Sequence, residues 1–148
     1  MYIMRHIAEK DFEAIAEIEI KISEISFKGK AITDKDFHRK KLAKAKDRTG
    51  MVVLEDTQTG KLLGWLWMER KQNSLTGEVY ASFKSFYAEE SIRGEHIVDE
   101  LFDKGIAYAR ECKATHIVGK VHAGNIPMRS LYKKHDFVPT HITMEMEL

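Results

Sequence analysis

Two short segments of the chain have residue types and spacing suited to chemistry at a phosphate-containing ligand. In the first, an apolar stretch ending at Ala88 leads through Glu89-Glu90-Ser91 to Arg93-Gly94, and an amphipathic helical pattern begins directly after them. The first amides of a helix have no intrahelical acceptor and together carry roughly half a positive charge. Such a helix start binds phosphate, and a nearby arginine adds a charge-assisted hydrogen bond. An ordinary strand-to-helix connection has the same pattern, so this segment alone leaves both interpretations open.

The second segment begins at Asn125 and includes Leu131 and Tyr132 on a short helical pattern. A tyrosine hydroxyl has an ordinary pKa of about 10 and can donate a proton or a hydrogen bond. Taken alone, Tyr132 is as readily explained as a core aromatic of a short helix. The chemical interpretation depends on the surrounding motif.

Together, the order and separation of these segments resemble the GNAT superfamily of acyl-CoA N-acyltransferases. The loop motif of that family is (Arg/Gln)-x-x-Gly-x-(Gly/Ala), and Arg93 matches its first position. Its later helix motif is Asn-x-x-Ala-x-x-Leu-Tyr, matched by Asn125, Leu131 and Tyr132, and Phe137 matches the aromatic of the Gly-Phe pair that follows. The resemblance covers nearly the whole chain, because the order of the expected elements also agrees.

Four positions depart from the family pattern. His96 stands where the family prefers glycine, Val98 where it prefers glycine or alanine, Met128 where it prefers alanine, and Asp136 replaces the glycine before Phe137. Backbone binding of phosphate survives a change of side chain, because every residue except proline keeps its amide. A left-handed backbone at His96 would nevertheless cost about 1–2 kcal/mol, and Val98 could push the helix off the sheet. Weakened CoA binding is therefore one expectation.

The resemblance implies transfer of an acetyl group from acetyl-CoA, the cosubstrate, to a primary amine by direct attack. It also implies that the strand at residues 78–88 splays from the strand at 117–121, and that pantetheine lies between them against strand backbone. The residues expected to bind acetyl-CoA are Phe86, Tyr87, Ala88, Arg93, Gly94, Glu95, His96, Ile97, Val98, Asn125, Met128 and Tyr132.

By the same resemblance, Tyr132 occupies the position of the acid that assists departure of the thiolate. An attacking alkylamine is mostly protonated at pH 7, so a base is also expected. Glu78, at the start of the central strand, is the catalytic candidate for the base, and His122 is an alternative. Either is more simply explained as a solvated surface residue, and the sequence does not identify the base.

These residues must be positioned by an α/β fold, a mixed α+β sheet with helices packed on its faces. The hydrophobic periodicity predicts the order β-α-α-β-β-β-α-β-α-β. Thr33 and Asp36 predict a capping box at the start of the second helix. The last strand has the clearest pattern, because Ile142, Met144 and Met146 alternate with polar residues. The predicted strands span 2–7, 51–54, 62–68, 78–88, 117–121 and 142–148, and the predicted helices span 12–25, 33 to before Gly50, 95–112 and 125–135.

Length and composition predict one domain over residues 1–148. The net charge of +1 gives no reason to expect nucleic acid or a membrane as partner. Cys112, the single cysteine, is interpreted as a small buried hydrophobe, and the absence of a cysteine pair suits a reducing, cytoplasmic location. The seven histidines have no paired spacing, so no metal is expected.

Three functional hypotheses remain at this point. The first is the acetyltransferase, with a small-molecule or peptide amine as acceptor. The second is a non-catalytic acyl-CoA-binding module of the same fold. The third, nucleic-acid binding through the basic residues 38–46, rests on one stretch only. A homodimer is compatible with the resemblance, although no residue indicates it.

Overall fold

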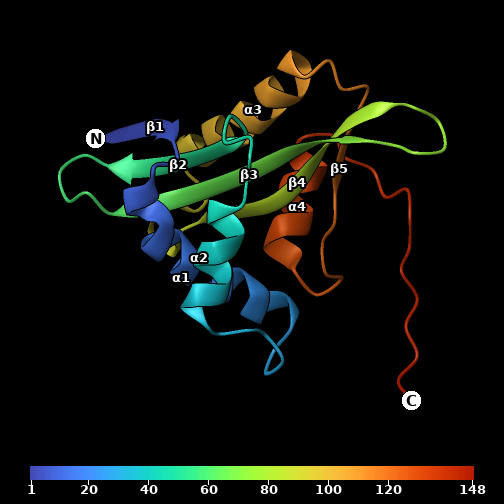
Figure 1. The fold of residues 1–148 in the computed structure, drawn as a ribbon, viewed down its shortest axis with the longest axis horizontal. Coiled ribbons are helices and arrows are strands. Elements are labelled where there is room, and N and C mark those ends of the chain that lie inside the picture. The colour runs from blue at the N-terminus through green and yellow to red at the C-terminus, as the bar shows by residue number, and fades with distance from the viewer.

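Residues 1–148 fold, in the computed structural model, around a five-stranded sheet of order β1-β2-β3-β4-β5 (Figure 1). The first four strands pair antiparallel and β4 pairs with β5 in parallel, which confirms the predicted mixed sheet. The strands are β1 (Tyr2–His6), β2 (Met51–Asp56), β3 (Leu62–Gln72), β4 (Val79–Ala88) and β5 (Ile117–Gly119). The helices are α1 (Phe12–Ser26), α2 (Lys35–Ala43), α3 (His96–Glu111) and α4 (Ile126–Lys134), with short 3-10 turns η1 (Glu9–Asp11) and η2 (Glu90–Ile92).

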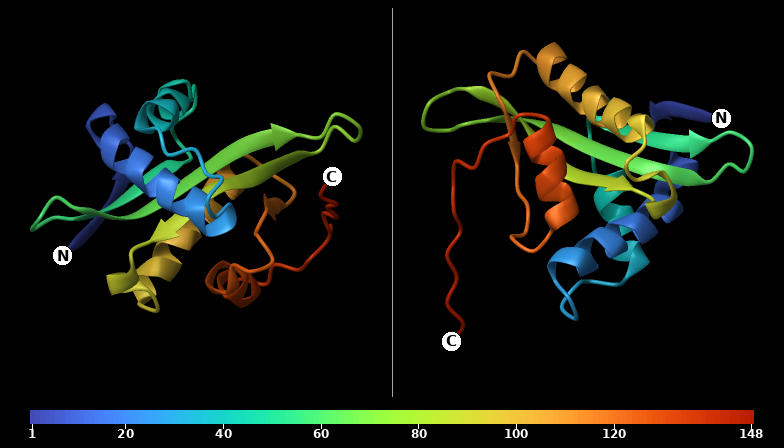
Figure 2. Two further views of the ribbon diagram at one scale, coloured as in Figure 1. Left: turned by 90° about the horizontal axis from the view of Figure 1, so that it is seen from below. Right: turned by 180° about the vertical axis from the view of Figure 1, so that it is seen from behind.

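The helices cover the sheet in two layers. Helices α1 and α2 pack on one face, and α3 and α4 lie on the other (Figure 2). The α1–α2 layer buries Trp65 and Trp67 of β3 with Ile15, Ile18 and Leu42. None of these helices is long and apolar enough to cross a membrane.

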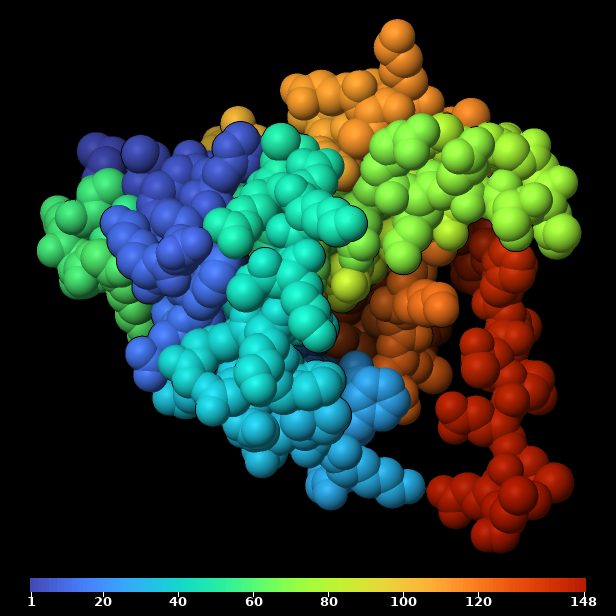
Figure 3. Space-filling view, viewed as in Figure 1, coloured from blue at the N-terminus to red at the C-terminus, as the bar shows by residue number.

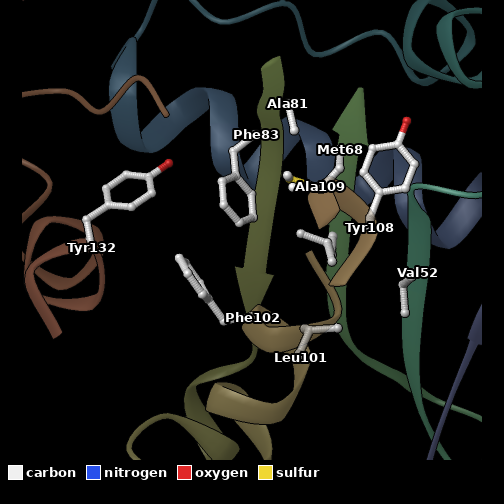
Figure 4. Packing of buried hydrophobic residues seen from close by; sticks show 10 residues of the cluster. Val52, Met68, Ala81, Phe83, Leu101, Phe102, Tyr108, Ala109 and Tyr132 are labelled. Atoms are coloured by element: carbon white, nitrogen blue, oxygen red, sulfur yellow. The ribbon is translucent and has the colours of Figure 1, made fainter. Parts of the chain in front are cut away.

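The core of the α3–α4 layer combines aliphatic side chains with the aromatic rings of Phe83, Phe102, Tyr108 and Tyr132 (Figure 4). Phe83 of β4 and Phe102 of α3 pack with ring centroids 4.9 Å apart and planes tilted by 31°, and Tyr132 of α4 packs against both. Gly105 brings α3 close to the sheet, because a methyl group there would lie 3.0 Å from the Phe83 ring. This close packing fixes the helix against the strand that carries the candidate site.

A β-bulge interrupts β4 at Lys84. Ser85 pairs with Trp67 and Phe83 pairs with the next residue, Met68, so Lys84 has no partner in β3. An extra residue reverses the alternation of side chains between the two faces. Phe83 therefore faces α3, whereas Ser85 faces α1 and contacts a side chain of that helix.

Two details of the predicted elements need correction. The second helix is capped by Asp34, whose side chain accepts a hydrogen bond from the Asp36 amide at 2.9 Å, and not by Thr33. Strand β5 ends at Gly119 and not at Val121.

The predicted strand at 142–148 is wrong for the single chain. Residues 138–148 form no helix or strand, and all of them are exposed, with Ile142 at 84% and Met144 at 85%. The alternation is a property of the segment alone, whereas a strand also needs a neighbour to pair with. The observed order is therefore β-α-α-β-β-β-α-β-α without the last strand.

Helix α4 ends in a Schellman motif at Asp136. The Phe137 amide donates to Tyr132 O at 2.9 Å and the Asp136 amide donates to Lys133 O at 3.1 Å. Asp136 has a φ of 64°, in the left-handed region that favours glycine. This is one of the positions at which the sequence departs from the family pattern.

The replacement Asp136→Gly is expected to stabilise the protein by about 0.5–1 kcal/mol, because glycine adopts a positive φ without a steric cost. The thermal midpoint should rise by about 1–4 °C. Asp136→Ala is the control and should bring no gain, since alanine keeps the steric cost. Equal midpoints for the wild type and the glycine variant would contradict the argument.

Candidate active site

A cleft opens where β4 and β5 part. The two strands pair only at Ala81↔Ile117, Ser82↔Val118 and Phe83↔Gly119. From the bulge at Lys84 to Ala88, β4 has no strand neighbour on this side. A hollow of about 90 Å³ lies in the gap, lined by residues that include Phe83, Ser85, Phe86, His122, Asn125, Met128 and Tyr132.

Tyr132 is one of the residues that line this hollow, and its hydroxyl lies next to Gly119. The Asn125 side chain caps α4 by accepting from the Met128 amide at 3.2 Å, which fixes the start of the helix that carries Tyr132. The Tyr132 ring lies over Gly119, where a methyl group would overlap the hydroxyl oxygen. Burial raises the pKa of Tyr132 to about 12. The hydroxyl therefore stays protonated at neutral pH and can act as a hydrogen-bond donor.

The loop before α3 offers free donors at the other end of the cleft. Gly94 has a φ of 84°, and the amides of Gly94, His96 and Ile97 donate to no acceptor in the protein. Glu95 occupies the N-cap without a side-chain hydrogen bond. Arg93 Nε donates to Ala88 O at 2.9 Å, which holds the guanidinium beside the end of β4 and leaves its terminal NH₂ groups free. This combination suits an anionic group such as a pyrophosphate.

A buried carboxylate lies next to the cleft on the opposite layer. Glu19 of α1 is 3% exposed and accepts hydrogen bonds from Ser85 Oγ, which lies 2.9 and 3.0 Å from its two oxygens, and from Trp65 Nε1 at 3.3 Å. No lysine or arginine pairs with it. Because Ser85 also lines the hollow, its hydroxyl connects the cleft to this carboxylate.

The sequence profile of the acetyltransferase (GNAT) family matches residues 5–137. The chain belongs to this family. The match ends at Phe137 and thus contains the loop, the cleft and α4. Members of the family are acyltransferases, so the chain is one as well.

Several solved structures share the fold. A putative acetyl transferase from Pyrococcus furiosus is 20% identical, with a TM-score of 0.78 and full coverage of both chains. A ribosomal-protein-alanine N-acetyltransferase from Brucella melitensis is 16% identical, with a TM-score of 0.72 and full coverage of both chains. A transcriptional regulator from Bacillus halodurans is 16% identical, with a TM-score of 0.79, also over both full chains. At these identities the likeness concerns the fold alone. No curated protein sequence matches the chain.

Neither of the two steric problems expected from His96 and Val98 is present in the structure. Only Lys113 and Asp136 among the non-glycine residues have a positive φ, so His96 carries no left-handed strain. The His96 side chain is 83% exposed, with Nε2 3.5 Å from Glu100. Val98 is buried with Leu54 in a small cluster and leaves α3 in contact with the sheet.

Glu78 does not lie in the cleft between β4 and β5. Glu78 is exposed and precedes β4 at the hairpin turn, where its carbonyl accepts from the Asn73 amide at 2.8 Å. The cleft begins beyond Phe83, toward the other end of the same strand. The remaining loop and strand residues predicted from the sequence, including Phe86, Tyr87 and Ala88, do lie along the open edge of β4 or at the start of α3.

His122, the alternative base, does line the hollow. Its Nδ1 accepts a hydrogen bond from the Gly124 amide at 3.0 Å. In the neutral ring the proton then resides on Nε2, which cannot accept a second one. The buried Glu19 was missed because its charge suggested the solvated side of the helix. Its spacing was a usable signal, since Glu19 follows Ile15 by four residues and precedes Ile22 by three, on the apolar face.

Proposed function

We propose that the protein transfers an acetyl group from acetyl-CoA to a primary amine by direct attack. The observation that carries this proposal is the set of groups along the open edge of β4. Tyr132 and Ser85 line the hollow, Ser85 connects it to a buried carboxylate, and unpaired amides lie beside Arg93 at the end of the strand. Each of these groups matches one requirement of acyl transfer between a thioester and an amine.

The free donors of the loop fit acetyl-CoA. The amides of Gly94, His96 and Ile97 and the Arg93 guanidinium would hold its pyrophosphate, and the open edge of β4 would hold its pantetheine. Acetyl-CoA supplies the acetyl group as a thioester. The exposed Glu90 and Glu95 in the same loop oppose an anion, which makes Arg93 important for binding.

Tyr132 would donate a hydrogen bond to the sulfur as negative charge develops on it. Complete proton transfer from a hydroxyl with a pKa of about 12 to a thiolate with a pKa near 8.5 is unfavourable by roughly 5 kcal/mol. A strong donor that keeps its proton is nevertheless effective in a water-poor site, where it stabilises the developing charge. The role of Tyr132 is thus that of a hydrogen-bond donor to the leaving group.

Glu19 would take the proton of the attacking amine through Ser85. The Ser85 hydroxyl donates to Glu19, so its oxygen lone pairs remain available to an N–H group in the hollow. As the amine donates its proton to Ser85 Oγ, the serine proton passes to Glu19. The Ser85 hydroxyl lies 2.9 and 3.0 Å from the two Glu19 oxygens, so the serine proton has a direct path to the carboxylate.

The rim of the hollow indicates a class of acceptor. Lys120 lines it and forms no ion pair within the chain. The charge of this lysine favours an amine that also carries a carboxylate or phosphate. A screen should therefore pair each amine with an analogue that lacks the anionic group.

Thermal unfolding with and without acetyl-CoA is the first test of the proposal. A ligand at 100 times its Kd adds about 2.7 kcal/mol, which should raise the midpoint by several degrees. Release of free thiol in the presence of candidate amines then tests transfer. Absence of any shift at millimolar acetyl-CoA would contradict the proposal. A shift without transfer to any amine would favour the non-catalytic module.

The Arg93→Ala variant is expected to bind acetyl-CoA about tenfold more weakly or worse, because it removes the cation from the loop. Titration calorimetry on the folded variant measures the effect. Arg110→Ala, at the exposed far end of α3, is the matched control and should bind like the wild type. Equal affinities for the two variants would remove Arg93 from the binding site.

A further inference from the structure

A basic surface covers the loop after α1 and the helix α2. Residues 28–48 contain nine lysines and arginines against three aspartates, a net charge of +6, whereas the whole chain carries +1. The rest of the chain is therefore acidic, and the positive charge is concentrated in one place. Figure 3 shows this segment in light blue and turquoise, over much of the visible face. We call residues 28–48 the basic segment.

Most cations of the basic segment have no partner in the chain. Lys35 pairs with Glu17, and Arg39 pairs with Asp36. The other seven form no ion pair, and the fully exposed ones among them are Lys28, Lys30, Lys40, Lys44 and Lys46. Unpaired like charges on one surface repel each other and attract an anionic partner.

The basic segment borders the candidate active site by two routes. Ser26, at the end of α1, lines the hollow, and Lys28 follows it in the next loop. Across the sheet, Lys41 Nζ of α2 and Lys84 Nζ of the β4 bulge lie 5.7 and 4.3 Å from the centroid of one ring, that of Trp67. Lys84 itself lines the hollow. Positive charge therefore extends from the rim of the hollow over α2.

The loop and the helix of this surface are held in place. His38 is 2% exposed, and its Nε2 donates a hydrogen bond to Ile32 O at 2.9 Å, which ties the loop to α2. Lys35 Nζ lies 2.7 Å from a Glu17 oxygen and connects α2 to α1. A surface that is already ordered loses little conformational entropy when a partner binds.

We infer that the basic segment binds an acidic stretch of polypeptide whose own amine is acetylated in the hollow. The amine belongs to an N-terminus or to a lysine near that stretch. The inference rests on the proposed function, because it names the kind of molecule that carries the acceptor amine.

The size and chemistry of the surface favour a polypeptide over other anions. Acyl transfer needs a primary alkylamine, which polypeptides have and nucleic acids lack. Helix α2 alone is about 13.5 Å long, so a small amine held in a hollow of about 90 Å³ cannot also contact its far end. A polyamine has the same sign of charge as the surface and is repelled.

Apolar side chains lie among the lysines and at their edge. Phe27, Ile32 and Phe37 are 62%, 49% and 46% exposed. A peptide can cover such groups with its own apolar side chains, and burying them adds to the attraction between the charges. The surface thus offers both kinds of contact that an acidic peptide with some apolar residues can make.

Transfer to a pair of synthetic peptides tests the inference. Both have about twelve residues, a free N-terminal amine and one lysine, and they differ only in carrying glutamate or glutamine at the other polar positions. At low salt the acidic peptide should have a kcat/KM about tenfold or more above that of its partner, and the ratio should shrink as salt screens the charges. Equal values would overturn the inference. Transfer to small amines alone would also overturn it and would leave the proposed function intact.

Binding without acetyl-CoA separates docking from transfer. Fluorescence anisotropy of the labelled acidic peptide should show about tenfold weaker binding or worse for Lys40→Glu/Lys44→Glu, at two exposed positions one turn apart at the end of α2. The control is Lys104→Glu/Arg110→Glu, which changes the net charge equally on α3, on the other face of the sheet (Figure 2). It should alter binding by about twofold at most.

Equal effects of the two double variants would show a response to net charge alone and would overturn the inference. Tighter binding of an RNA oligonucleotide than of the acidic peptide would overturn it as well. Peptide binding that depends on Lys40 and Lys44, in a protein that acetylates no amine, would contradict the proposed function and not the docking of the acidic stretch.

Discussion

Glu19→Gln is expected to lower kcat by about 100-fold or more at pH 7 without loss of stability. Glutamine keeps an acceptor for Ser85 and Trp65 but cannot take up the proton of the amine. It also removes a buried charge that has no cationic partner, so the thermal midpoint should stay the same or rise. An activity loss in a protein of unchanged or higher stability separates proton transfer from a structural role.

The pH dependence of this variant gives a second readout. An alkylamine with a pKa near 10.4 becomes increasingly neutral as the pH rises, so it needs the base less. The difference in kcat between the wild type and Glu19→Gln should therefore shrink between pH 7 and pH 10. Glu24→Gln, exposed on the same helix, is the matched control and should keep full activity. If Glu19→Gln were fully active at pH 7, Glu19 would be excluded as the base.

The second large effect is expected for Tyr132→Phe, with a loss of about 100-fold in kcat and nearly unchanged binding of acetyl-CoA. Phenylalanine keeps the ring between Phe83, Phe102 and Phe137 and removes only the donor. The Tyr132 hydroxyl forms no hydrogen bond within the protein, so its removal leaves no partner unsatisfied. Stability should stay constant or increase slightly.

The raised pKa of Tyr132 makes this prediction more specific. With a pKa of about 12 the hydroxyl remains protonated up to about pH 11, so the profiles of kcat against pH for the two proteins should be parallel below that value. Tyr80→Phe in β4 is the control, since the Tyr80 ring stacks on His116 and its hydroxyl forms no hydrogen bond. A Tyr132→Phe enzyme with wild-type kcat would limit Tyr132 to packing.

Local sequence patterns predicted most of the fold because turn residues, capping residues and hydrophobic periodicity determine where most helices and strands begin and end. Helix α3 begins after Gly94, and α4 begins at the Asn125 cap, as expected from the turn and capping residues. Residues 138–148 are the exception. Their alternation is that of a strand, but a strand forms only by pairing with a neighbour, and in this structure the segment pairs with none.

The candidate site was predictable only where its residues belong to a motif. Arg93 and Tyr132 could be placed from their spacing, and the structure places them at the loop and the cleft. Glu78 was a poor candidate because the strands β4 and β5 are parallel and part toward their carboxyl ends, whereas Glu78 precedes β4. Glu19 meets Ser85 across 66 positions, and a bulge at Lys84 decides which face Ser85 occupies. A local sequence pattern therefore cannot predict the contact between Glu19 and Ser85.

The Tyr132 hydroxyl can occupy its position only because residue 119, on β5, has no side chain. A β-carbon at residue 119 would overlap this hydroxyl, so the bare backbone of β5 determines where the side chain from α4 can lie. A substitution at residue 119 would therefore affect the chemistry of Tyr132, although residue 119 has no functional group of its own. Even alanine, the smallest substitute, would displace the hydroxyl while leaving every reacting group in the sequence intact.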